Sequence, residues 1–176
     1  LEFSALAAHK WRDALDAMHA ALKIDSGFVQ VYLTGGIAYA ELGKADSAEW
    51  AWDQAYKMDP VQPGVRAYRV WRYMIAGNRA EAQKAFDEFD RTIRGNSRLG
   101  DMVVAQLALG NRGAALDALE AAAKQRSFYV TTAALGCDPT YGALWQEPRF
   151  LAIVKALGQE MCVDIAPALG QPRTVR

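Results

Sequence analysis

The chain has 176 residues, with 20 basic and 20 acidic side chains and a formal net charge of zero. Zero net charge excludes a globally basic nucleic-acid binder and an acidic solvating tail. Hydrophobic residues make up 52% of the chain, too many for a disordered protein. The longest uncharged stretches, Ser26 to Ala40 and Ser127 to Cys137, are too short to cross a bilayer. We therefore expect a globular protein without membrane insertion.

Alanine accounts for 33 of the 176 residues, and because it favours closely packed helices we expect an all-α chain. Alanines recur at spacings of 34, 34 and 33 residues at Ala14, Ala48, Ala82 and Ala115. A large apolar residue follows each one four positions later, at Met18, Trp52, Phe86 and Leu119. A further alanine or phenylalanine comes three positions after that, at Ala21, Ala55, Phe89 and Ala122. These offsets place each trio on one helical face that is buried.

A glycine precedes three of the recurring alanines by five residues, at Gly43, Gly77 and Gly110. Glycine commonly ends a helix, so each repeat is predicted to be a helical hairpin. The expected repeats cover residues 1–28, 29–62, 63–95 and 96–125. A capping segment over 126–158 and a loosely held tail over 159–176 follow them.

The second repeat shows the pattern most completely, at Tyr32, Gly36, Tyr39, Gly43, Ala48, Trp52, Ala55, Met58 and Pro60. This spacing resembles the tetratricopeptide (TPR) repeat, and the resemblance covers residues 9–158. His9 replaces the turn glycine in repeat one, while Ser26 and Arg94 replace the closing proline in repeats one and three. The resemblance implies a right-handed α-solenoid of about four hairpins with a C-terminal cap.

The two ends of the array depart from the repeat. Apolar residues of the short opening helix, such as Phe3 and Leu6, would normally pack against an earlier helix, so we expect a preceding segment; an exposed, frayed end is the alternative. Beyond the repeats we expect a short helix from Ser127 to Leu135 and another from Pro148 through Leu157, ending at Gly158. The apolar stripe of this last helix can close the open end of the stack: Phe150, Ile153, Val154 and Leu157.

No catalytic constellation, metal site or cofactor site is predicted. His9 and His19 are interpreted as solvated or half-buried side chains. Gly35 and Gly36 fall inside a predicted helix, which favours close helix packing over a phosphate-binding loop.

Cys137 and Cys162 are either free thiols, the interpretation we favour, or a disulfide. A disulfide would close a loop of about 25 residues and contribute roughly 3 kcal/mol. The cellular compartment is open, with the cytoplasm favoured over the periplasm.

In TPR proteins the first helix of each repeat lines a concave groove. The corresponding positions here form a predicted, largely apolar partner-binding groove: Gln30, Leu33, Ile37, Glu41, Ala67, Trp71, Met74, Val104 and Leu107. Such a groove suits an amphipathic helix or an extended apolar segment. The alternative is that these residues pack against neighbouring helices, the cap or a second copy of the chain.

Arg66, Arg69 and Arg72 form a second candidate surface, a positive stripe that could meet an anionic partner. The alternative is a solvated face neutralised by Asp87, Glu88 and Asp90. Nucleic-acid binding through this stripe is a further hypothesis, but we do not favour it.

The sequence thus predicts a noncatalytic interaction module, or scaffold, that binds a protein or peptide. The alternative is a sensory or regulatory segment of a larger bacterial protein. After the last repeat come Asp138-Pro139, Tyr141, Leu144 and the run Glu147-Pro148-Arg149-Phe150. This segment resembles the end of TPR regions in bacterial multidomain signalling proteins, in which an aspartate usually occupies the position of Glu147. Those regions occur beside winged-helix regulators, nucleotide cyclases or protein kinases, so the resemblance implies an attached effector domain.

Overall fold

The structure is a computed structural model, and it describes Leu6, residues 9–93, residues 99–127, Val130 and residues 135–159. Within these residues all regular structure is helical, which confirms the predicted all-α class. The elements in chain order are α2 Trp11–Ile24, α3 Val29–Glu41, α4 Ala45–Met58, α5 Pro63–Ile75, α6 Arg79–Ile93, α7 Leu99–Ala108, α8 Arg112–Lys124, the 3-10 helix η1 Pro139–Leu144, and α10 Pro148–Ala156. No helix of the described part is long and apolar enough to span a bilayer.

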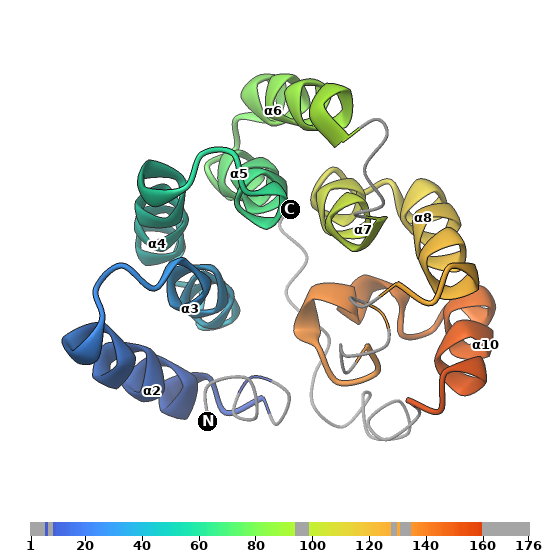
Figure 1. The fold of residues 1–176 in the computed structure, drawn as a ribbon, viewed down its shortest axis with the longest axis horizontal. Helices are drawn as coiled ribbons and strands as arrows, with labels where there is room; N and C mark the ends of the chain where they lie inside the picture. Colours follow the sequence, from blue (N-terminus) through green and yellow to red (C-terminus); the bar gives the residue numbers. More distant parts are fainter. Residues whose placement is uncertain (1–5, 7–8, 94–98, 128–129, 131–134, 160–176) are drawn as a thin grey trace.

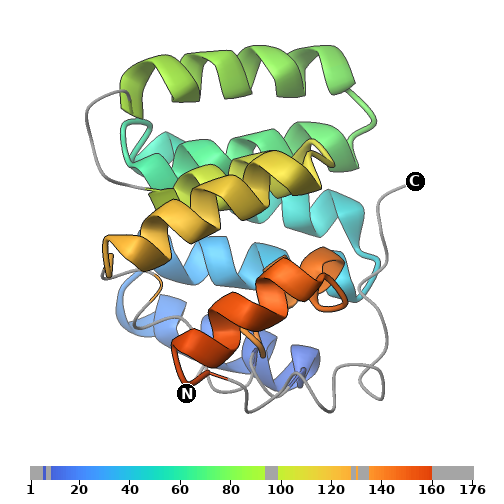
Figure 2. The same ribbon diagram turned by 90° about the vertical axis from the view of Figure 1, so that its right-hand side faces the viewer.

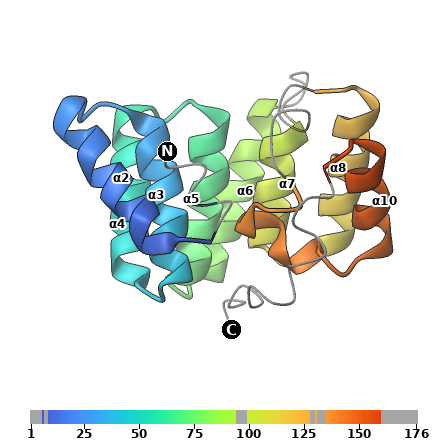
Figure 3. The same ribbon diagram turned by 90° about the horizontal axis from the view of Figure 1, so that it is seen from below.

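Consecutive helices pack against one another along the chain. The pairs α3–α4, α5–α6 and α7–α8 lie within 29–62, 63–95 and 96–125. The helices follow an arc, with α3, α5 and α7 on its inner side and α2, α4, α6 and α8 outside (Figure 1). Seen from below, they stand side by side from α2 to α10 (Figure 3). One helix of each pair therefore faces the centre of the arc.

The recurring apolar trios are largely buried, as the spacing predicts, although Ala21 and Phe86 are half-buried. The four alanines that lead them, Ala14, Ala48, Ala82 and Ala115, are 0% exposed. Of the large residues that follow, Met18, Trp52 and Leu119 are buried and Phe86 is half-buried. Alanine at the leading position allows two helix backbones to approach closely, because its side chain occupies little space.

The predicted glycine turns have left-handed backbone conformations. Gly43, Gly77 and Gly110 have φ angles of +72°, +72° and +80°. The residue after each glycine donates a backbone hydrogen bond back into the helix, as Lys44 N does to the Tyr39 carbonyl at 2.9 Å. This pattern ends a helix by satisfying its last carbonyls. His9 and Arg126 adopt the same left-handed conformation without being glycine, at φ of +55° and +46°.

Two adjacent glycines of α3 let the helices around it approach closely. A Cβ at Gly35 would overlap the sulfur of Met18, and a Cβ at Gly36 would overlap the Trp52 indole. The structure therefore confirms a packing role for this pair.

The C-terminal cap packs on α8, and Figure 2 shows α8 and α10 as neighbours. Phe150, Ile153 and Val154 of α10 are buried in one cluster with Leu119 of α8, as the apolar stripe predicts. Arg149 adds polar contacts, donating from Nη2 to Asp117 Oδ1 at 2.8 Å and from Nε to Glu120 Oε1 at 2.9 Å.

Several expectations fall largely outside the described residues: the packing of the opening helix, most of the helix from Ser127 to Leu135, and the tail beyond Gln159. Cys137 is described and is disulfide-bonded, so the free-thiol interpretation is wrong for this residue. Cys162, the one other cysteine of the sequence, lies outside the described part.

The two ends of the arc meet at His9. Its Nε2 donates a hydrogen bond of 3.2 Å to the Cys137 carbonyl, 128 residues further along the chain. The His9 ring also contacts two indoles, with centroids 4.8 Å from Trp11 and 5.5 Å from Trp145. These contacts join the two ends of the arc into a ring.

Candidate functional site

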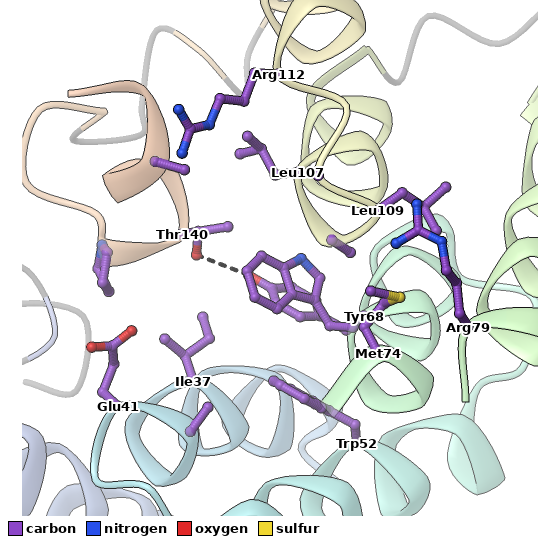
Figure 4. Close-up of a pocket in the computed structure, with 16 residues that line it drawn as sticks. Ile37, Glu41, Trp52, Tyr68, Met74, Arg79, Leu107, Leu109, Arg112 and Thr140 are labelled. Atoms are coloured by element: carbon purple, nitrogen blue, oxygen red, sulfur yellow. Dashed lines mark hydrogen bonds between the residues drawn. The ribbon is translucent and has the colours of Figure 1, made fainter. Parts of the chain in front are cut away.

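A cavity of about 420 Å³ lies on the inner side of the ring. We call it the inner cavity. It is lined chiefly by α3, α5, α7 and η1, with Trp52 of α4, Arg79 of α6 and Arg112 of α8 completing the wall (Figure 4). This volume is within the range typical of ligand-binding pockets.

Most of the wall is apolar. α3 supplies Ile37, α5 supplies Trp71 and Met74, and α7 supplies Leu107. Residues 71 and 74 are one helical turn apart, so the α5 pair projects from one face of its helix. The wall therefore follows from the same periodicity that forms the helices.

Hydrogen bonds hold the aromatic side chains of the wall in place. Trp52 Nε1 donates to the Leu33 carbonyl at 3.1 Å, and Trp71 Nε1 donates to the Val104 carbonyl at 3.0 Å. The Tyr68 ring stacks on Trp52 with centroids 5.7 Å apart. These bonds satisfy each indole N–H and fix the orientation of its ring.

One hydrogen bond joins α5 to the C-terminal cap across the cavity. The Tyr68 hydroxyl and Thr140 Oγ1 lie 3.4 Å apart, 72 residues apart in sequence (Figure 4). Asp138, just before η1, accepts a bond from the Thr140 backbone N–H at 2.9 Å and so positions the start of η1. Burial raises the pKa of this carboxyl.

Three charged side chains line the inner cavity: Glu41, Arg79 and Arg112. Arg112 Nη1 lies 4.0 Å from Glu147 Oε1, at the limit of an ion pair. Arg79 is exposed and forms no ion pair with any residue that the structure describes. The lining thus carries two guanidinium groups and one carboxylate.

Five of the nine predicted groove residues line the inner cavity: Ile37, Glu41, Trp71, Met74 and Leu107. Three others, Leu33, Ala67 and Val104, are between 0% and 2% exposed, so they are core residues and not surface available to a partner. Gln30 is half-buried at the start of α3 and does not line the cavity.

Several residues outside the predicted groove also line the cavity. Tyr68 precedes Trp71 by one helical turn, so the spacing could have placed it in the groove. Trp52 was assigned to the core alone, yet its ring also reaches the cavity. Thr140 had no sequence signal, because its position depends on how the cap folds back over α5.

Two of the three arginines of the predicted stripe, Arg69 and Arg72, form ion pairs with acidic residues of α4 and α6. Arg72 pairs with Asp53 of α4, with Nε to Oδ1 at 2.6 Å and Nη2 to Oδ2 at 3.0 Å. Arg69 pairs with Glu88 of α6 at 3.3 Å and lies over the Tyr56 ring, 4.3 Å from its centroid. Burial alone would lower the pKa of Arg72, but the Asp53 bond raises it overall.

Arg66, the first residue of the stripe, bonds to neutral groups. It donates to the Pro60 carbonyl at 2.8 Å and to Thr92 Oγ1 at 3.0 Å. Glu88 was among the acids expected to neutralise the stripe, whereas Asp53 of α4 was not. The geometry favours a structural role for these arginines over an open anion site.

The histidines match the expectation of solvated or half-buried side chains. His9 is half-buried at the ring closure, where burial lowers its pKa against the opposing effects of the Cys137 carbonyl and Asp138. His19 is exposed, and its Nε2 lies 3.2 Å from the Tyr39 hydroxyl. Within the described part of the chain, no group of three or more His, Cys, Asp or Glu residues could hold a metal ion.

No protein-family model, curated protein or solved structure matches this chain. The features that bear on function are therefore the repeat pattern and the chemistry of the inner cavity.

Proposed function

We propose that the chain is a noncatalytic interaction module that binds a segment of a protein or peptide in the inner cavity. A single observation carries this proposal: an apolar cavity of about 420 Å³ is built from side chains of several different helices. A segment that presents a bulky apolar side chain would bury it against Ile37, Trp71 and Met74. Such burial is worth about 1.5–3 kcal/mol per side chain.

We propose further that this all-α fold is a right-handed α-solenoid of TPR type. The spacing of about 34 residues supports it, as do the helix pairs that lie within the expected repeat ranges. In such an array, packing between repeats holds the inner helices rigid. The wall is therefore already formed before a partner arrives, which lowers the entropic cost of binding.

The proposal is tested by affinity capture of protein partners, in which the wild type is compared with variants of the cavity wall. Ile37→Glu and Met74→Glu each place a carboxylate among apolar side chains, and both residues are half-buried. Val61→Glu is the matched control, because Val61 is 71% exposed and does not line the cavity. We expect the wild type and Val61→Glu to retain the same protein partners and both cavity variants to lose them.

Far-ultraviolet circular dichroism and thermal melts accompany the capture, so that only folded variants are compared. Partners that bind both folded cavity variants as strongly as the wild type would contradict the proposal. Trp71 is less suitable for this test, because its indole N–H is bonded to Val104 and its replacement changes stability as well.

A further inference from the structure

The closed ring limits what the inner cavity can hold. The contact between His9 and Cys137 joins the ends of the arc, and the bond between Tyr68 and Thr140 joins α5 to η1. The space of about 420 Å³ that the ring borders is in the range of pockets that hold one small molecule. A compact ligand therefore fills this cavity better than a helix of several turns.

The chemistry of the wall selects an apolar body for such a ligand. Trp52, Tyr68 and Trp71 present aromatic surface, while Ile37, Met74 and Leu107 present aliphatic or thioether surface. Flat aromatic rings stack on indoles and pack against methionine. The hydrogen bonds of Trp52 and Trp71 hold these surfaces in place without a ligand.

The charged residues of the lining determine which charge is favoured at the other end of the ligand. Arg79 is exposed and forms no ion pair with described residues, and Arg112 reaches Glu147 only at 4.0 Å. Glu41 is the single acidic residue of the lining. Guanidinium groups bind carboxylate, sulfonate and phosphate oxygens through paired N–H donors, so an anionic head is favoured over a cationic one.

We propose that the inner cavity binds a small amphipathic anion, whose aromatic or branched aliphatic body packs on the tryptophan wall. Its anionic head contacts one of two guanidinium groups, Arg79 or Arg112, which lie on opposite sides of the cavity (Figure 4). This inference goes beyond the proposed binding of a protein segment, because it needs no protein partner. Binding and release involve no covalent step.

A pair of matched fluorescent probes tests the inference. 8-Anilinonaphthalene-1-sulfonate carries an anionic group on an apolar aromatic body, and N-phenyl-1-naphthylamine has the same body without the charge. Titration of the folded wild-type chain is expected to give one saturable site for each probe. The sulfonate should bind about tenfold more tightly, a difference of about 1.4 kcal/mol, because only the sulfonate can form a charge-assisted hydrogen bond with an arginine.

Variants separate the two halves of the inference. The double variant Arg79→Gln and Arg112→Gln should weaken the sulfonate about tenfold and leave the neutral probe unchanged. Ile37→Glu should weaken both probes. Arg91→Gln is the control for surface charge, because Arg91 is exposed on α6 and does not line the cavity; it should change neither affinity.

Three results would overturn the inference: no saturable site, equal affinity for the two probes in the wild type, or sulfonate binding that persists in the double arginine variant. Its failure would not affect the capture experiment, which measures protein partners without a small ligand. If the capture experiment contradicts protein binding, the probe titrations still test the small-anion site. The two proposals can therefore fail separately.

Discussion

The indole Nε1 of Trp71 donates a hydrogen bond of 3.0 Å to the backbone carbonyl of Val104, and so ties α5 to α7. The same side chain packs against all three hydrophobic clusters of the described core. It also forms part of the inner cavity wall. Trp71 thus both links two inner helices and lines the cavity. A substitution at this position is therefore expected to change stability and ligand binding together.

Replacing Trp71 with phenylalanine should therefore destabilise the fold. The variant loses the bond to Val104, worth about 1 kcal/mol, together with part of the ring packing. We expect the free energy of unfolding to fall by about 1–3 kcal/mol in urea titrations. Trp50→Phe is the control, since Trp50 is 47% exposed and packs edge-on against Tyr32; its change should stay within about 0.5 kcal/mol. Equal effects of the two substitutions would contradict the coupling.

The second prediction concerns the close approach at Gly36. In Gly36→Ala the new methyl group overlaps the Trp52 indole, which is itself held by its bond to the Leu33 carbonyl. Overpacking of this kind costs about 1–3 kcal/mol. Gly113→Ala in α8 provides the opposite case, because nothing lies within 4 Å of its added Cβ; there we expect a gain of up to about 1 kcal/mol. Thermal melts that shift the same way for both variants would refute the packing argument.

The predictable part of this structure is the part that depends on local sequence. The buried trios led by Ala14 and Ala48 repeat a spacing that places them on one helical face. The turns at Gly43 and Gly77 follow from the conformational freedom of glycine. These features follow from residue type and spacing along the chain, so the periodic pattern was sufficient to locate them.

The inner cavity was only partly predictable, because its shape depends on the rotation of each helix and on distant contacts. Leu33 and Ile37 are one turn apart on α3, yet Leu33 is buried and Ile37 lines the cavity. Thr140 reaches the cavity because the cap folds back onto α5. The partner of Arg72 is Asp53, 19 residues earlier on a neighbouring helix, and no local pattern links the two.

The third prediction uses the left-handed turns at Arg126 and Gly77. Arg126 is an exposed residue at φ of +46°, a conformation that costs an ordinary L-residue about 1 kcal/mol. Arg126→Gly should therefore stabilise the protein by up to about 1 kcal/mol. Gly77→Ala should destabilise it by a similar amount, about 1 kcal/mol, although nothing lies within 4 Å of the added Cβ. Chemical denaturation measures both, and changes of the same sign would rule out the backbone explanation.

The fourth prediction concerns the disulfide of Cys137. Thiol titration of the denatured chain should find no free thiol before reduction and two afterwards, because the sequence contains two cysteines. Cys137→Ser should lower the free energy of unfolding under non-reducing conditions, by about 3 kcal/mol if the bond closes a loop of some 25 residues. Adding reductant should bring the wild type close to the variant. Two free thiols in the unreduced, oxidised preparation would contradict the bonded state.

The fifth prediction is a pH dependence at the ring closure. Burial lowers the pKa of His9 in the folded chain below the value of 6.5 that applies in the unfolded chain. The unfolded state therefore binds more protons in the interval between these two values. The stability that neutral His9 contributes is fully present above pH 6.5 and is lost progressively as the pH falls through the interval.

His9→Asn is the informative variant, because asparagine tolerates the left-handed conformation at φ of +55° and cannot be protonated near neutral pH. Denaturation between pH 7.5 and 5.5 should show a larger loss of stability for the wild type than for His9→Asn. Asp138 is present in both proteins, so the effect of its raised pKa contributes to both curves of stability against pH. The difference between the curves then reports mainly the proton on His9. Parallel curves would show that His9 does not couple ring closure to pH.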